Sequence, residues 1–99
     1  MTSNVLQNID RLIATFPAQP SQSQYDMLSI IEWYHCAATY ELSRIAPHDT
    51  PYDLQCVVKK LYSKLLDCVP DGQVTARHNT SEEVRSRLQC VYHKYCNAT

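Results

Sequence analysis

The sequence predicts an all-α fold: a compact single-domain bundle of about four helices formed by residues 1–99. Apolar residues recur at helical spacing in four segments, and a helix-start motif precedes three of them. Glycine occurs only once, as Gly72, whereas sheets with tight turns and phosphate-binding loops depend on glycine. The length suits one domain, and 44% hydrophobic with 19% charged residues is typical of a folded chain.

The three helix-start motifs are capping boxes, in which Ser or Thr stands three residues before an acid. They are formed by Ser23 with Asp26, Thr50 with Asp53, and Thr80 with Glu83. The hydroxyl of such a box accepts a hydrogen bond from the backbone N–H of the third helical residue, and the acid there favours the positive end of the helix dipole. We therefore expect helices to begin directly after Ser23, Thr50 and Thr80.

The first helix is expected at about 4–16, before Pro17. Its apolar stripe consists of Leu6, Ile9, Ile13 and Phe16. The second helix is expected at about 24–45, where Pro47 stops it. Because its surface is apolar around most of its circumference, it must be covered on several sides. Whatever this chain leaves uncovered is then a contact surface for a second molecule.

The third helix is expected at about 51–68, with Pro51 at its first position, where the missing N–H costs nothing. Its buried stripe consists of Leu54, Val57 or Val58, Leu61, Leu65 and Cys68. A turn at 70–72 opens the longest loop, which reaches Asn79. The fourth helix, at about 81–95, has a narrow stripe of Val84, Leu88, Val91 and Tyr95. We expect an up-and-down bundle with the second and third helices at its centre.

Aromatic residues give the first functional hypothesis. Seven tyrosines and one tryptophan are many for 99 residues, and both side chains are enriched at protein contacts. The second helix carries aromatics around most of its circumference. We therefore expect a small non-enzymatic interaction or regulatory module. A surface that includes Trp33, Tyr34 and Tyr40 would receive another protein or a second copy in a homodimer.

Basic residues give the alternative hypothesis, binding to nucleic acid, RNA in particular. Residues 1–49 carry two basic against five acidic side chains, and residues 50–99 carry seven against five. A stripe on the third and fourth helices could follow a phosphate backbone. It would consist of Lys59, Lys60, Lys64, Arg85 and Arg87. The net charge of −1 is lower than nucleic-acid binding usually requires.

A zinc-supported regulator is the third hypothesis, with Cys90, His93 and Cys96 as candidate ligands. Thiolate and imidazole are ligands that zinc accepts. However, positions six apart on a helix are separated by about 9 Å along its axis, whereas each Zn–S bond measures about 2.3 Å. All three ligands therefore require the helix to fray after His93, and otherwise only a neighbouring pair could bind. We favour no metal and no other cofactor.

Catalysis, secretion and membrane insertion are not expected. A cysteine nucleophile paired with His35, His78 or His93 would need an orienting group and an oxyanion site, and the sequence places neither. We infer no small-molecule substrate. The N-terminus lacks a basic region followed by an apolar run, and no apolar stretch reaches the roughly 18 to 20 residues of a membrane span. We therefore expect an intracellular protein, cytoplasmic or nuclear and not secreted, with five reduced cysteines.

Overall fold

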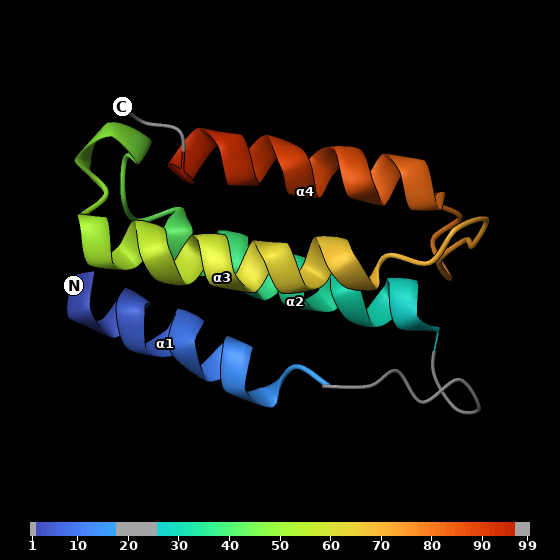
Figure 1. The fold of residues 1–99 in the computed structure, drawn as a ribbon, viewed down its shortest axis with the longest axis horizontal. Helices are drawn as coiled ribbons and strands as arrows, with labels where there is room; N and C mark the ends of the chain where they lie inside the picture. The colour runs from blue at the N-terminus through green and yellow to red at the C-terminus, as the bar shows by residue number, and fades with distance from the viewer. Residues whose placement is uncertain (1, 18–25, 97–99) are drawn as a thin grey trace.

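The computed structural model describes residues 2–17 and 26–96 (Figure 1). Its elements, in chain order, are α1 (Thr2–Thr15), α2 (Met27–Leu42), the 3-10 turn η1 (Pro47–Asp49), α3 (Tyr52–Cys68) and α4 (Ser81–Cys96). Within the described ranges the fold is the predicted all-α bundle of four helices. These ranges contain no β-strand and only one isolated bridge, between Val74 and Thr80. No described helix is long and apolar enough to cross a membrane.

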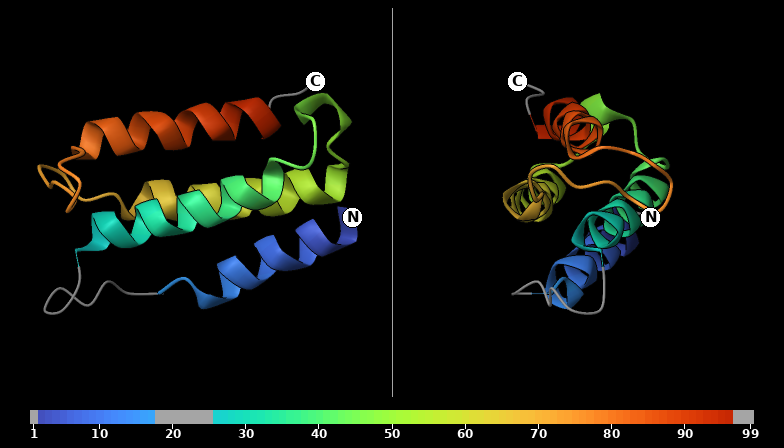
Figure 2. Two further views of the ribbon diagram at one scale, coloured as in Figure 1. Left: turned by 180° about the vertical axis from the view of Figure 1, so that it is seen from behind. Right: turned by 90° about the vertical axis from the view of Figure 1, so that its right-hand side faces the viewer.

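The four helices alternate in direction along the chain, as expected for an up-and-down bundle (Figure 1). Their neighbours, however, do not follow chain order. α3 packs most closely against α4 and α1, and only slightly against α2. α1 and α4 lie on opposite sides of the bundle and do not pack against each other over the described residues (Figure 2). Helices α2 and α3 therefore contact all the others, which agrees with their expected central position.

The core is formed by apolar stripes of all four helices. Its fully buried members include Val5, Ile9, Leu28, Ile31, Leu42, Leu54, Val58, Leu61, Tyr62, Leu65 and Leu88. In α1 the stripe begins at Val5, and the expected Leu6 is only half-buried. In α3 the core takes Val58 rather than Val57, together with the large ring of Tyr62. These differences follow from helical geometry, because positions i, i+4 and i+8 remain close to one face.

The capping box at Thr80 forms as predicted. The backbone N–H of Glu83 donates to Thr80 Oγ1 at 3.2 Å, and the carboxylate of Glu83 accepts from the backbone N–H of Thr80 at 3.2 Å. The Thr80 hydroxyl donates to the same carboxylate at 3.0 Å. These hydrogen bonds lower the pKa of Glu83 below its ordinary value. α4 therefore begins at Ser81, the residue that the sequence indicated.

The start of α2 differs from the prediction. Ser23 and residue 24 lie outside the described residues. Asp26, expected at the third helical position, is instead the N-cap, with extended backbone angles and a carboxylate that accepts from Leu28 N–H at 3.1 Å. Asp is as good an N-cap as Ser, so a Ser-x-x-Asp pattern offers two alternative starting points. The helix uses the second one.

The predicted cap at Thr50 is wrong. The Thr50 hydroxyl donates to the carbonyl of Ala46 at 3.1 Å and is buried beneath η1, so it does not cap α3. The N-cap position belongs to Pro51, which makes no side-chain cap bond, and the helix begins at Tyr52. Gln55 Nε2 donates to the Thr50 carbonyl at 2.9 Å. The prediction failed because the hydroxyl of Thr50 bonds within the preceding turn, η1, instead of capping α3. The Thr-x-x-Asp pattern gives no information about that turn.

α2 ends at Leu42, three residues before the expected end. The Ser43 hydroxyl donates to the Tyr40 carbonyl at 2.7 Å, and Ile45 N–H donates to the Leu42 carbonyl at 3.0 Å, which tightens the last turn. A residue before proline is pushed out of the helical region, and Ala46 before Pro47 is extended. The helix therefore unwinds through a tight turn into η1.

The long loop between α3 and α4 is tied together around Thr75. The buried Thr75 hydroxyl accepts from Arg77 N–H at 3.2 Å and from Asn79 N–H at 3.0 Å. Gly72 adopts a φ of +69° in the turn that opens the loop, a conformation that glycine adopts without strain. These bonds fix the shape of the loop, and Asn79 Nδ2 attaches it to α2 by donating to the carboxylate of Glu32 at 3.0 Å.

Candidate interaction surface on α2

The outer face of α2 exposes two large aromatic side chains. Trp33 is 62% exposed and Tyr40 is 63% exposed, and they stand two turns apart. Cys36, also exposed, lies between them, and Arg44 follows one turn after Tyr40. The Arg44 guanidinium lies over the Tyr40 ring, 5.3 Å from its centroid. We call Trp33, Cys36, Tyr40 and Arg44 the α2 stripe.

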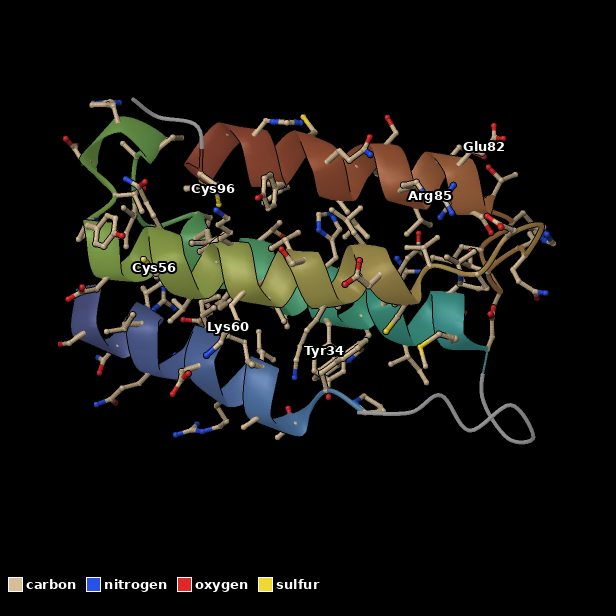
Figure 3. All side chains as sticks on the ribbon, in the orientation of Figure 1. Tyr34, Cys56, Lys60, Glu82, Arg85 and Cys96 are labelled. Carbon is tan, nitrogen blue, oxygen red and sulfur yellow. The ribbon has the colours of Figure 1, made fainter. Side chains whose placement is uncertain are left out.

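Tyr34, the third predicted contact residue, does not belong to the α2 stripe. Its ring packs edge-on against Phe16 with centroids 5.1 Å apart, and its hydroxyl donates to the Thr15 carbonyl at 2.9 Å. Figure 3 shows Tyr34 between α2 and the end of α1. One helical step turns Tyr34 away from Trp33 by roughly 100°, although the two rings still pack edge-on with centroids 5.1 Å apart. Tyr34 therefore fastens α1 to α2.

The remaining aromatics divide between core and surface. Tyr62 is fully buried, and the buried Tyr95 donates from its hydroxyl to the Leu42 carbonyl at 3.2 Å. Tyr52 is 77% exposed and stands at the start of α3. Among the described residues, the exposed large aromatics are Trp33, Tyr40 and Tyr52, and α2 carries two of them.

A small hollow adjoins Trp33, between α2 and the α3–α4 loop. Its volume is about 260 Å³, and its lining consists of Ser29, Glu32, Trp33, Cys36, Thr75, Ala76 and Arg77. Ala76 N–H donates to Ser29 Oγ at 3.5 Å, which joins the two walls. Sequence reasoning missed the loop wall, because residues 75–77 and α2 are far apart in the chain and no local pattern links them.

A polar cluster beneath this surface joins α2 to α3 and α4. The carboxylate of Glu32, whose side chain is 13% exposed, accepts from Arg87 Nη2 and from Asn79 Nδ2. One turn later, His35 Nδ1 forms a 3.0 Å hydrogen bond with the hydroxyl of Tyr62. Burial lowers the pKa of His35, and the positive charge of Arg87 lowers it further, while Glu32 opposes the shift. Burial raises the pKa of Tyr62.

This polar cluster is suited to holding helices together. The imidazole of His35 bonds to a phenol that solvent does not reach, so the pair presents no activated nucleophile. Every buried side-chain nitrogen or oxygen among the described residues has a hydrogen-bond partner. The cluster is therefore satisfied within the chain and fixes the position of α2.

The five cations of the predicted nucleic-acid stripe do not form one surface. Arg87 pairs with Glu32 of α2, and Arg85 pairs with Asp71 at 3.1 Å. The lysines at 59, 60 and 64 are exposed on α3. Figure 3 shows Lys60 extending toward α1 and Arg85 on α4, on opposite sides of α3. Lys60 and Lys64 lie one turn apart on α3, whereas Lys59 is turned away from Lys60 by roughly 100° and its charge acts on Cys96 of α4. Both arginines are paired with carboxylates.

The candidate zinc ligands lie on the last turns of α4. Cys90 and His93 are exposed, and the His93 ring packs edge-on against Tyr92 with centroids 5.7 Å apart. Cys96 is half-buried, and its thiol donates to the Gln55 carbonyl at 3.8 Å. α4 is helical through Cys96, so the fraying that three-fold ligation requires does not occur. The described residues contain no group of three or more His, Cys, Asp or Glu side chains placed to hold a metal ion.

All five cysteines are described, and none forms a disulfide. Cys36, Cys56 and Cys90 are exposed, whereas Cys68 and Cys96 are half-buried. Burial raises the pKa of both half-buried thiols. The exposed thiols thus belong to three different helices.

Comparison of the chain with protein-family models, with curated proteins and with solved structures found no match.

Proposed function

We propose that this protein is a small non-enzymatic interaction or regulatory module that binds another protein chain through the α2 stripe. One observation carries the proposal. Trp33 and Tyr40 are more than half exposed on one face of α2. The other exposed large hydrophobic side chains among the described residues, Tyr52 and Val74, lie on other segments. Exposed aromatic rings that share a face are typical of the central contacts of protein interfaces.

The energy available from these two rings is substantial. A covered aromatic side chain buries about 150 to 250 Å², and apolar burial contributes about 25 cal/mol per Å². Covering the exposed 62% of Trp33 and 63% of Tyr40 is therefore worth on the order of 3 kcal/mol for each ring, before the cost of association. Arg44 adds a side chain that is enriched at interfaces.

The test is affinity capture with the full chain as bait, followed by identification of the bound proteins. The double variant Trp33→Ser, Tyr40→Ser should lose the specific partner. The matched control is Tyr52→Ser, which removes an aromatic side chain that is 77% exposed on another helix and should retain it. If the double variant and the control behave alike, the α2 stripe is not the binding surface.

Nucleic-acid binding through α3 is the alternative, supported by the exposure of Lys59, Lys60 and Lys64. With both arginines paired to carboxylates, about three phosphate contacts remain. The logarithm of the binding constant should then fall with log salt at a slope of roughly −2 to −3. Binding of an RNA oligomer that shows no salt dependence, or no binding at low salt, would exclude this alternative.

A further inference from the structure

The α2 stripe has a symmetrical arrangement of side-chain sizes. The small residue Cys36 of the stripe and the half-buried Ala37 beside it flank its midpoint. A large aromatic stands about one turn away on either side, Trp33 before the midpoint and Tyr40 after it. We propose that this face binds a second copy of the chain, with the two α2 helices antiparallel about a two-fold axis through the midpoint. The inference rests on the proposed function and specifies its partner.

The two-fold arrangement brings unlike rings together. Because Trp33 and Tyr40 are equally far from the midpoint, antiparallel pairing sets Trp33 of each copy opposite Tyr40 of the other. The small side chains of Cys36 and Ala37 let the helix axes approach to the usual packing distance of about 8 to 10 Å. The aromatic rings therefore meet at the two ends of the contact, and the small side chains meet at its midpoint.

The hollow beside Trp33 provides room for an incoming ring. Its volume of about 260 Å³ lies below the roughly 300 to 1,000 Å³ of typical ligand pockets, but a cavity of roughly 150 Å³ can hold a benzene ring. Antiparallel pairing places Tyr40 of the second copy over this hollow. Arg77 on the loop wall supplies a cation, which favours the face of an aromatic ring.

The ends of the α2 stripe carry complementary charge. Arg44 is exposed and forms no ion pair within the described part of the chain. Asp26 is exposed at the opposite end of α2, and its carboxylate accepts from the Ser29 hydroxyl at 2.9 Å. Antiparallel pairing places Arg44, just after the end of α2, near the start of α2 in the second copy, where Asp26 lies. Symmetry produces this attraction twice, and it selects the antiparallel orientation over the parallel one.

The size of the face sets the strength of the contact. α2 spans 16 residues, so its face is about 24 Å long and roughly 10 Å wide. Its area is therefore on the order of 240 Å², well below the roughly 800 Å² per partner of a standard stable interface. We therefore expect a reversible dimer that dissociates on dilution. Sedimentation equilibrium from micromolar to millimolar protein should show a monomer–dimer equilibrium. Tyr40→Ala should weaken it at least about tenfold, the effect of a hot-spot residue.

Crosslinking tests the geometry. In a chain whose only cysteine is Cys36, the two thiols lie beside the axis, and a short bismaleimide should join them into a dimer. A chain whose only cysteine is Cys56, an exposed thiol on α3, is the matched control and should not be crosslinked. Arg44→Glu should reduce both the Cys36 crosslink and the sedimentation dimer, because it places two acids together at each end.

The outcomes separate this inference from the proposed function. A monomer at every concentration, with no Cys36 crosslink, overturns the dimer; if Trp33 and Tyr40 are still needed to capture a different protein, the proposed function stands. Crosslinking through Cys56 as efficient as through Cys36 also overturns the antiparallel dimer. If neither self-association nor capture depends on Trp33 and Tyr40, both proposals fail. Since both side chains are mostly exposed, circular dichroism should show unchanged folding of the variants.

Discussion

The hydrogen bond between His35 and Tyr62 makes a sharp prediction about stability. Tyr62→Phe keeps the fully buried ring and removes only the hydroxyl, which lies 3.0 Å from His35 Nδ1. The substitution leaves no cavity larger than one oxygen atom but deprives His35 Nδ1 of its partner. An unsatisfied buried group costs about 1 to 3 kcal/mol, and because His35 is only half-buried we expect a loss of about 1 kcal/mol. In a domain of this size, each kcal/mol lowers the unfolding temperature by roughly 4 to 8 °C.

Urea and thermal unfolding, followed by circular dichroism, would measure this loss. Tyr52→Phe is the control, because that side chain is 77% exposed, and it should change the free energy of unfolding by less than about 0.5 kcal/mol. A double-mutant cycle with His35→Leu isolates the bond, since removing both partners should cost less than the sum of the two single changes. Equal stability of the Tyr62→Phe and Tyr52→Phe variants, or strictly additive effects, would refute the reasoning.

Three further predictions concern single residues. The folded state lowers the pKa of His35 below its ordinary value of 6.5, so the unfolded chain binds more protons below that pH. The stabilisation of the folded state by neutral His35 is therefore complete above pH 6.5 and is lost as the pH falls below that value. In the His35→Gln variant the free energy of unfolding should depend less on pH in this range, and identical pH profiles of variant and wild type would contradict the pKa shift. Thr80→Ala should cost about 1 kcal/mol in urea unfolding through loss of the α4 cap, and an unchanged midpoint would refute that role. Gly72→Ala, at a φ of +69° with open space around the glycine, should cost roughly 1 to 2 kcal/mol from backbone strain alone, and a stabilised variant would show that the turn tolerates a side chain.

The sequence by itself determined the helices, because short-range physics decides them. Apolar residues at i, i+3 and i+4 specify a buried stripe, and the reciprocal bonds of Thr80 and Glu83 involve only residues three apart. The single glycine was a sound argument for an all-α fold, and it lies in the turn where a positive φ occurs. Even so, local patterns misplaced two helix starts, because Asp26 competed with Ser23 and a neighbouring turn engaged Thr50.

Only the tertiary structure decided which of the predicted site residues share a surface. The sequence singled out Trp33, Tyr34 and Tyr40, but packing against Phe16 removes Tyr34 from the exposed face. Arg87 bonds to Glu32, 55 residues away, and is lost from the basic stripe. Exposure and ion pairing depend on which helices become neighbours. Contacts between residues far apart in the chain set that arrangement, and no short-range pattern encodes them.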